Sequence, residues 1–456
     1  MSAQTISQDI FDRYRKRTPR SSKLTETAKQ WMGGGETRRA TYYHPYPTFM
    51  EKGEGAYLID CDGNKYLDLL YNYTSVLHGH AHPKINEASR RILETGIVLG
   101  SIAESQTRLA EILCNRIPAM ERVRFCNCGT EATMFALRTA RAFTGKNGIL
   151  KMDGGYHGGH EFAQINLFPQ VDAKGLPVPT AESHIPRGLL EDAYIAPFND
   201  LETVEEILKK NGDKIGAVIV EPCLGAGGQI EAEPGYLARM RELTRKFDVL
   251  LIFDEVMQFR HHTGGVQAAQ NVEPDLTCLG KIIGGGYPVG AFGGRKEVMS
   301  VYDVDHKPSS LFHSGTFSGN NITMAAGITA MELYDESAVE RINALGDRLK
   351  KGMEDVIVEI GIKGCVTGLG SILNVHFQED RPRNGKEGML GGIAAADFLE
   401  LLHLEMMNRN IYPASRGMIV LSTVMTEEEV DQVIKVFKQT LELLKPFVAE
   451  KLPQLV

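Results

Sequence analysis

The feature that most constrains the fold is a long alternation of short apolar runs with amphipathic stretches, between about residues 105 and 325. Compact apolar runs are typical of strands buried on both faces, and apolar residues at helical spacing indicate helices. The runs are Ile149–Lys151, Ala217–Val220 and Leu250–Phe253, and the helical stretches are Thr107–Arg116 and Glu131–Phe143. This alternation is the pattern of βα units, so we predict an α/β fold with a mostly parallel sheet.

The two ends of the chain have a different pattern. Residues 55–70 contain two short strand-like segments around Asp62-Gly63-Asn64, which indicates a hairpin. Further elements are predicted after residue 335: an amphipathic helix at 339–356, strands near 364–377 and a final helix at 427–450. We therefore predict three segments: an N-terminal part at 1–75, a large domain at 76–334, and a C-terminal part at 335–456 that forms a small α+β domain with the first.

Composition and charge argue against several classes of protein. The 456 residues have a formal charge of −8, and no run of Lys or Arg resembles a site for nucleic acid or lipid. No apolar run approaches the ~20 residues needed to span a bilayer, and the basic stretch 13–20 is interpreted as a solvated segment. The seven cysteines suggest no disulfide framework. We expect a cytoplasmic protein with reduced thiols that binds neither nucleic acid nor membranes.

Four short segments carry the chemistry, and the first is Asn127-Cys128-Gly129-Thr130-Glu131. It follows the strand-like run Val123–Phe125 and opens a predicted helix. Backbone N–H groups at a helix N-terminus bind anions, and the hydroxyl group of Thr130 adds a donor. The same residues would also serve as an ordinary helix start, so this segment alone leaves both interpretations open.

The second segment, Gly154-Gly155-Tyr156-His157-Gly158-Gly159-His160, places a flat aromatic residue among glycines. Glycines allow the backbone to approach a ligand closely, so the ring of Tyr156 would be able to lie against a planar molecule. A tight surface loop is the better explanation when this segment is taken alone.

The third segment, Leu250 to Val256, ends a buried run with the acids Asp254 and Glu255. Acids at this position lie at the carboxyl edge of a parallel sheet, where α/β proteins bind their ligands. A buried carboxylate needs a partner, because an unpaired one is costly. A protonated pyridine nitrogen would be a suitable partner, and a structural Arg or a helix cap is the alternative.

The fourth segment runs from Asp275 to Lys281 and continues to Gly284-Gly285-Gly286. Burial would lower the pKa of Lys281 and make its amine nucleophilic toward an aldehyde. A surface lysine at the start of a loop is the alternative. The glycine run lacks the Gly-x-Gly-x-x-Gly spacing of a dinucleotide site.

In this order, the four segments resemble the class III aminotransferases of pyridoxal-phosphate (PLP) fold type I, from about Pro45 to the region of Arg416. The resemblance implies PLP as the cofactor, Lys281 as its Schiff-base lysine and Asp254 as the partner of the pyridine nitrogen. It also implies an α/β large domain with a mostly parallel seven-stranded sheet, beside the small α+β domain formed by both termini.

The phosphate site implied by the resemblance draws on two parts of the chain. Gly129 and Thr130 would hold the phosphate beside Cys128, which stands where many relatives have Ser. The segment His313-Ser314-Gly315-Thr316-Phe317 matches a stretch whose Thr reaches the phosphate of the neighbouring subunit. Thr316 would therefore complete the partner's site, which implies a homodimer with shared active sites.

The remaining implied contacts surround the cofactor ring. Tyr156, with His157 next to it, would lie on one ring face and Val256 on the opposite face. Glu221, in Val220-Glu221-Pro222, matches an acid near the cofactor.

The alternating histidines His78, His80 and His82 are not interpreted as a metal site. The surrounding residues 79–83 are similar to a structural turn of the same family, and zinc needs about four ligands with supporting contacts. We predict that no metal is bound.

Arginines near both ends of the chain indicate how a substrate carboxylate would bind. Arg38 and Arg39 precede the stretch from Tyr43 to Pro47, and Arg416 is followed by Gly417. The candidate substrate-binding residues are Arg38, Arg39, Tyr43 and Arg416. This arrangement resembles the β-amino-acid (β-phenylalanine-type) transaminases. It implies ping-pong transfer of an amino group from an aromatic or aliphatic β-amino acid to a keto acid such as 2-oxoglutarate. Counting back from Tyr43 favours Arg38 over Arg39, and surface or structural roles are the alternative for each.

Three other functions are considered. Residues 277–296 are very similar to glutamate-1-semialdehyde aminomutase, but the Asn-Ser-Pro-Val-Arg stretch of that enzyme is missing and its gating loop is not evident in Leu167–Gly188. A D-phenylglycine-type transaminase is a second alternative, because it too has an Arg in both regions. A PLP-fold module without amine transfer is disfavoured by the intact set of Lys281, Asp254 and Tyr156.

Overall fold

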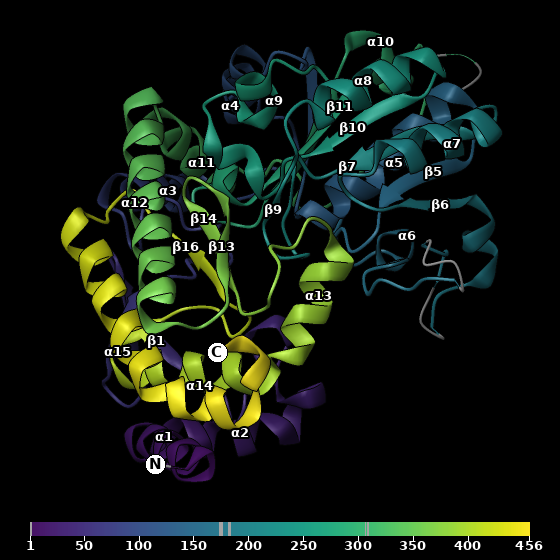
Figure 1. Ribbon diagram of the computed structural model, residues 1–456. Coiled ribbons are helices and arrows are strands. Elements are labelled where there is room, and N and C mark those ends of the chain that lie inside the picture. Colours follow the sequence, from purple (N-terminus) through teal and green to yellow (C-terminus); the bar gives the residue numbers. More distant parts are fainter. Residues whose placement is uncertain (1, 173–176, 181–183, 306, 308–309) are drawn as a thin grey trace. The chain divides into compact units, whose positions relative to one another are not determined.

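The computed structural model describes residues 2–172, 177–180, 184–305, 307 and 310–456, and Figure 1 shows its ribbon. The chain divides into two compact units, each formed by segments that are not continuous in sequence. Unit 1 comprises Met1–His82, Arg341–Arg381 and Leu390–Val456, and unit 2 comprises Pro83–Glu340 and Pro382–Met389.

The core of unit 2 is a seven-stranded sheet, and the α/β prediction is confirmed. Its order is β4 (Arg122–Cys126), β12 (Gly290–Gly294), β11 (Leu276–Gly280), β10 (Leu250–Asp254), β7 (Ile215–Val220), β5 (Gly148–Met152) and β6 (Ala193–Ala196). The strands β11, β10, β7, β5 and β6 run parallel to one another, and β12 pairs antiparallel with both β11 and β4. The sheet is therefore mostly parallel, as predicted.

Alternation along the strands of unit 2 builds one apolar core on each face of this sheet. Ile149 and Ile252 face the core that includes buried residues of α5 (Gly129–Thr144). Leu150 and Leu251 face the opposite core, which includes α7 (Leu201–Asn211) and α8 (Tyr236–Lys246). Because both faces are buried, the strands appear in the sequence as continuous apolar runs. The other elements are α3 (Pro83–Thr95), α4 (Glu104–Arg116), α6 (Glu161–Gln164), α9 (Gly265–Gln270), α10 (Lys296–Met299), α11 (Asn321–Leu333), β8 (Cys223–Leu224) and β9 (Ile230–Glu231).

Unit 1 contains two small sheets and long helices. One sheet has the order β1 (Met50–Glu54), β2 (Tyr57–Asp60), β3 (Lys65–Asp68), β15 (Ile411–Tyr412), and the other β13 (Cys365–Leu369), β14 (Ile372–His376), β16 (Met418–Val420). The predicted hairpin at Asp62–Asn64 is confirmed, because β2 and β3 pair antiparallel around it. The longer helices are α12 (Glu336–Ile360), which begins before the unit boundary, α13 (Gly385–Ala394), which crosses it, α14 (Ala396–Asn408) and α15 (Glu427–Lys451).

The N-terminal segment of unit 1 differs from the prediction. Residues 13–20 were expected to be solvated, but they belong to the helices α1 (Ala3–Arg17) and α2 (Pro19–Trp31). Ile6, Ile10 and Tyr14 lie four residues apart, so they share one face of α1, and all three are buried. A guanidinium nitrogen of Arg13 lies 2.7 Å from the buried carboxylate of Glu405. Arg15, Lys16 and Arg20 are exposed, as expected, but the interpretation missed the two helices because charged residues hid this apolar stripe.

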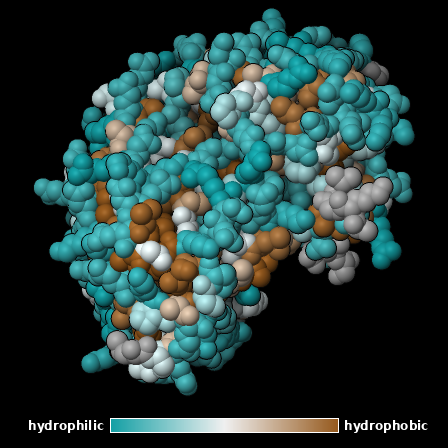
Figure 2. Space-filling model, viewed as in Figure 1, coloured by the Kyte–Doolittle hydropathy of each residue, from teal (hydrophilic) through white to brown (hydrophobic). Residues whose placement is uncertain are grey.

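The surface seen in Figure 2 is mainly hydrophilic, with separate hydrophobic patches. Over the described parts of the chain, no helix has the length and apolar character needed to cross a membrane. The stretch 167–188, in which a gating loop was not evident, lies partly outside the described residues.

Candidate active site

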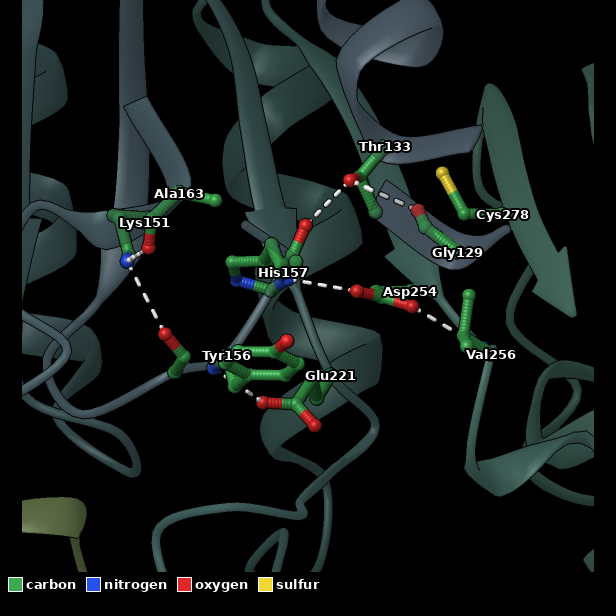
Figure 3. Close-up of polar contacts among 12 residues, drawn as sticks. Gly129, Thr133, Lys151, Tyr156, His157, Ala163, Glu221, Asp254, Val256 and Cys278 are labelled. Carbon is green, nitrogen blue, oxygen red and sulfur yellow. Dashed lines mark hydrogen bonds and ion pairs between the residues drawn. The ribbon is translucent and has the colours of Figure 1, made fainter. Parts of the chain in front are cut away.

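Four neighbouring strands of the unit 2 sheet end beside one another, and each is followed by polar residues. Asp254 ends β10, Glu221 follows β7 and Lys281 follows β11. Tyr156 and His157 lie on the loop after β5. The carboxyl ends of parallel strands share one edge of a sheet, which is where α/β proteins bind ligands. We call these five residues the strand-edge group, and Figure 3 shows most of them together.

Asp254 and His157 form the centre of the strand-edge group. His157 Nδ1 lies 2.8 Å from Asp254 Oδ2, and the backbone N–H of Val256 donates to Asp254 Oδ1 at 3.1 Å. Burial lowers the pKa of His157 although Asp254 opposes the shift, so the neutral ring donates from Nδ1. The other ring nitrogen, Nε2, is buried and has no hydrogen-bond partner among the described residues.

Glu221 supports the loop that carries Tyr156. Its Oε1 accepts the backbone N–H of Tyr156 at 3.0 Å, and its Oε2 accepts that of Gly225 at 3.1 Å. Burial raises the pKa of Glu221 to about 8, the negative charge of Asp254 adds to this rise, and the positive charge of Lys281 opposes it. The ring of Tyr156 is half exposed, so its face is accessible to a ligand.

Lys281 has an unusual backbone conformation. Its φ is +52°, in the left-handed region, and it directly follows the fully buried strand β11. A non-glycine residue in that region costs about 1–3 kcal/mol and persists where the surrounding structure fixes it. The strain places a lysine side chain at the edge of the sheet, close enough to Glu221 to affect the pKa of that acid.

The start of α5 forms the anion-binding part of the region. Cys128 is the N-cap residue, and its side chain makes no hydrogen bond to the helix. Two glycines allow close packing here. A Cβ atom on Gly129 would lie 2.8 Å from Val256 Cγ1, and one on Gly158 would lie 2.6 Å from Thr130 Cα. Thr130 Oγ1 accepts the backbone N–H of Gly159, so the helix N-terminus and the Tyr156 loop are joined.

Sequence reasoning missed two residues that hold this loop. Thr133 Oγ1, on α5, donates to the carbonyl oxygen of His157. Lys151, on β5, donates to three backbone carbonyl oxygens. A charge inside an otherwise apolar central strand was the available signal for Lys151. Thr133 gave no such signal, because threonine is an ordinary residue in a helix.

Thr316 lies in unit 2, outside the strand-edge group. It is exposed, and its segment is held through His313, whose Nδ1 accepts a hydrogen bond from Arg124 Nε at 2.9 Å. Its predicted role in a neighbouring subunit therefore stays a prediction.

A left-handed turn lies in unit 1, at Tyr71, Asn72, Tyr73 and Thr74, with φ of 43°, 50°, 54° and 76°. Consecutive left-handed residues without glycine are strained. The carboxylate of Asp68 stabilises the turn by accepting backbone N–H groups, including that of Tyr71 at 3.0 Å. The turn holds Asn72 and Tyr73 toward Arg38.

Arg38, Tyr73 and Arg416, here called the arginine group, lie near one another in unit 1. Arg38 donates to the side-chain oxygen of Asn72, and its guanidinium carbon lies 5.2 Å from the ring centre of Tyr73. Burial raises the pKa of Tyr73, and the positive charges of Arg416 and Arg38 oppose that rise. Within the described ranges, neither exposed guanidinium group pairs with a carboxylate.

Arg39 and Tyr43 lie apart from the arginine group. The guanidinium group of Arg39 packs over the ring of Tyr42, at 5.2 Å. Tyr43 is buried, and its hydroxyl group contacts Thr48 Oγ1 at 2.9 Å and Tyr14 at 3.3 Å. Tyr43 was predicted to bind substrate, but its hydroxyl group is bonded inside the core of unit 1.

The alternating histidines have separate contacts. His78 Nδ1 lies 3.0 Å from Thr423 Oγ1, and His80 Nε2 lies 2.7 Å from the buried carboxylate of Asp68. No cluster of three or more His, Cys, Asp or Glu side chains suited to a metal occurs in the described part of the chain.

The model of the family "Aminotransferase class-III" matches residues 39–441. The chain belongs to this family. This class III aminotransferase is 35% identical to the β-phenylalanine transaminase of Variovorax paradoxus, over 95% of this chain and 96% of that protein. It is 37% identical to glutamate-1-semialdehyde 2,1-aminomutase 2 of Halalkalibacterium halodurans, over 93% of this chain and 99% of that protein.

Among solved structures, the aminotransferase is similar to an omega-transaminase from Sphaerobacter thermophilus, with a TM-score of 0.90 and 39% identity. That match covers 93% of this chain and 98% of the other. The predicted PLP fold type I and the predicted class of enzyme are confirmed. Pyridoxal 5'-phosphate is the cofactor of the family.

The residues of unit 2 fit this cofactor. A helix N-terminus suits its phosphate, the buried carboxylate of Asp254 suits its protonated ring nitrogen, and Lys281 offers an amine for its aldehyde. The unpartnered Nε2 of the buried His157 shows that this region also has a polar atom directed to no protein group.

Proposed function

We propose that this aminotransferase moves an amino group from an aromatic or aliphatic β-amino acid to a keto acid such as 2-oxoglutarate. Lys281 binds the aldehyde of PLP, and Asp254 pairs with its ring nitrogen. The start of α5, at Cys128, Gly129 and Thr130, binds the phosphate, and Tyr156 and Val256 pack on opposite ring faces. His157 holds Asp254 in place and Glu221 holds Tyr156 in place, as the hydrogen bonds of these two pairs suggest.

The chemistry is divided between the cofactor and the protein. When bound, PLP supplies an aldehyde that carries the amino group and a ring that withdraws electrons. The charge of Asp254 keeps the ring nitrogen protonated, which strengthens that withdrawal. The amine of Lys281 would move a proton from the substrate carbon to the carbon that came from the cofactor aldehyde, as general base and then acid.

The arginine group binds the substrate carboxylate in this proposal. The supporting observation is that two guanidinium groups lie near one phenol and pair with no acid among the residues described, because such cations attract a carboxylate. Arg38 binds the carboxylate nearest the reacting centre. Arg416 mainly binds the second carboxylate of 2-oxoglutarate. Arg39, which packs on Tyr42, is the weaker candidate.

A β-amino acid is favoured over an α-amino acid by similarity to the Variovorax enzyme. In a β-amino acid the carboxylate lies one carbon further from the amine, a difference of about 1.5 Å. An arginine placed for one distance misaligns the other substrate, and misplacement of about 1 Å costs on the order of 10²-fold. The two classes should therefore differ in kcat/KM.

The half-reaction tests this substrate directly. We expect 3-amino-3-phenylpropanoate and 3-aminobutanoate to convert the bound cofactor to its amino form, followed by absorbance. Arg416→Ala should leave that half-reaction largely intact and slow the return half-reaction with 2-oxoglutarate. Failure of both β-amino acids would reject the proposal.

An aminomutase is the second candidate, because glutamate-1-semialdehyde aminomutases match nearly the whole chain at similar identity. In that case, the enzyme would isomerise glutamate-1-semialdehyde without a keto acid. A D-phenylglycine-type transaminase would instead convert the cofactor with D-phenylglycine and not with β-amino acids.

A homodimer is part of the proposal, because unit 2 exposes apolar side chains near the Thr316 segment. Hydrogen bonds from Asn321 N to Ile97 O and from Gln106 Nε2 to Gly319 O join this segment to residues 96–106. The exposed apolar residues of the two segments are Leu93, Ile97, Val98, Leu99, Ile102, Phe312 and Phe317. An apolar patch of this kind marks an interface, so sedimentation at micromolar concentration should give a dimer. An active monomer would contradict the proposed homodimer.

A further inference from the structure

Lys151 is a charged residue inside the unit 2 sheet, on the strand next to the edge strand β6. Its side chain is fully buried, on β5 between β7 and β6. No carboxylate pairs with it among the residues that the structure describes. Its Nζ instead donates to the carbonyl oxygens of Gly155, Ala163 and Ile165, at 3.1, 2.9 and 2.6 Å. A buried ammonium group costs several kcal/mol to desolvate, so apolar packing does not explain this residue.

The three carbonyl groups belong to the two ends of one loop. Gly155 directly precedes Tyr156, and Ala163 and Ile165 lie in and directly after α6. The ammonium group therefore joins the start of the loop to its end. Figure 3 shows Lys151 on one side of this loop, with His157 extending from the loop toward Asp254.

We propose that Lys151 is a positioning residue for the cofactor. Its ammonium group closes the loop of residues 155–165 and thereby holds Tyr156 against Glu221 and His157 against Asp254. This inference rests on the proposed cofactor roles of the strand-edge group, and it is independent of the substrate. Lys151 itself contacts neither cofactor nor substrate.

The number of N–H donors indicates which protonation state of Lys151 closes the loop. An ammonium group has three N–H donors, one for each carbonyl oxygen, whereas a neutral amine has only two. The neutral amine would also direct a lone pair at a carbonyl oxygen. Closure of the loop therefore needs the charged form.

Burial and nearby ionisable groups affect the pKa of Lys151 and therefore its charge. Burial lowers the pKa of Lys151 to about 7, and the charges of Glu221 and Asp153 oppose the shift. Asp153, just beyond β5, has its own pKa raised by burial to about 6. His157 and His160 of the loop have pKa values lowered by burial, and they face Lys151 as neutral rings near pH 7.

Lys151→Met tests the proposal, because it keeps the length of the side chain and removes the donors and the charge. Lys146→Met is a matched control, because Lys146 Nζ also donates to backbone carbonyl oxygens, of Gly212 and Asp248, away from the loop. The full chain is studied with and without PLP. Hydrogen exchange reports on the loop, and absorbance titration gives the Kd for PLP.

We expect Lys151→Met to weaken PLP binding by about 10-fold or more, the loss of one or two hydrogen bonds, and to speed exchange within residues 155–165. Lys146→Met should change the Kd by less than about 2-fold. Normal affinity and normal loop exchange in Lys151→Met would overturn the proposal. If that variant does not fold, Lys151→Gln, which keeps two N–H donors, should bind PLP with intermediate affinity, and wild-type affinity in it would overturn the proposal.

A pH series separates positioning from general loss of structure. The ratio of the Kd of Lys151→Met to that of the wild type should be largest near pH 6 and should shrink toward pH 8.5, as wild-type Lys151 loses its proton. A constant ratio would overturn the role of the charge. No amine substrate is present, so failure of the β-amino-acid proposal would leave these results unchanged.

Discussion

The strand-edge group of unit 2 and the arginine group of unit 1 are opposite in character. Asp254, Glu221 and His157 are buried, and each has a hydrogen bond within the protein. Arg38 and Arg416 are exposed, and no described acid neutralises either of them. The first region is held by hydrogen bonds within the protein, although His157 Nε2 has no described partner, and the second region has charge left for a ligand.

This difference suggests a division of tasks. Buried, bonded groups keep a fixed geometry, which suits a step common to every substrate. Exposed cations are able to move and to bind different carboxylates. Substitutions in the strand-edge group should therefore affect all amine donors alike, whereas those in the arginine group should affect donors according to their carboxylate.

Lys281→Ala should have the largest effect. Loss of the amine removes both the covalent link and the proton carrier, so transamination of every donor should become undetectable. The variant should still fold and bind PLP noncovalently. Mass spectrometry after borohydride reduction of the wild type locates the modified lysine. A pyridoxyl adduct on any other lysine would contradict the assignment.

Asp254→Asn should slow all donors by roughly 10²-fold or more, about 3 kcal/mol of barrier at about 1.36 kcal/mol per tenfold. The substitution removes a charge and keeps the shape. Glu255→Gln is the matched control, because Glu255 is the adjacent buried acid but its carboxylate accepts N–H groups of Val266 and Gln267. Its kcat should remain within about 3-fold, since it moves no charge at the ring nitrogen. An Asp254→Asn rate near that of the control would show that the charge is not needed.

Arg38→Ala should lower kcat/KM for β-amino acids by about 10²-fold, the cost of a misplaced substrate. An amine donor without a carboxylate, such as 1-phenylethylamine, should react equally with wild type and variant. Arg39→Ala controls for the loss of a neighbouring surface charge, and it should have less than about a 3-fold effect. If Arg38→Ala slowed the reaction of 1-phenylethylamine as strongly as that of β-amino acids, the proposed division of tasks between the strand-edge group and the arginine group would be wrong.

Strand periodicity predicted that Asp254 lies at the edge of the sheet, whereas Glu221 was identified by resemblance. The apolar run Leu250–Phe253 lies within β10, which ends at Asp254, so a polar residue after the run had to lie at the sheet edge. Lys151 was counted as part of an apolar run. Its acceptors come from the conformation of a loop, which periodicity does not encode.

The arginine group was predicted less completely. Arg38 and Arg416 were identified by resemblance, but Tyr73 was not. The left-handed turn that holds it contains no glycine, so its one turn signal in the sequence is Asn72. Tyr43 was assigned to substrate because its neighbours in sequence include the arginines, whereas burial directs its hydroxyl group into the core.

The smallest expected effect concerns His403, which lies in the core of unit 1 and packs edge-on against Tyr43 at 4.4 Å. Burial lowers the pKa of His403 to about 3. Its unfolded pKa is near 6.5, so the unfolded state binds a proton between pH 6.5 and pH 3 and the folded state does not. The wild type therefore loses stability as pH falls through this range, about 2 kcal/mol of it by pH 5.

His403→Phe should remove that loss, because a phenyl ring does not titrate and fits beside the aromatic ring of Tyr43. Thermal midpoints measured from pH 7.5 to pH 5 should fall less steeply in the variant, and the gap between the two proteins should widen by a few °C toward acid. Preference among amine donors should stay unchanged, because His403 contacts the buried Tyr43 rather than the arginine group. A gap that stayed constant with pH would mean that the pKa of His403 is the same in the folded and unfolded states. A changed donor preference would mean that the core behind Tyr43 is not separate from the exposed cations.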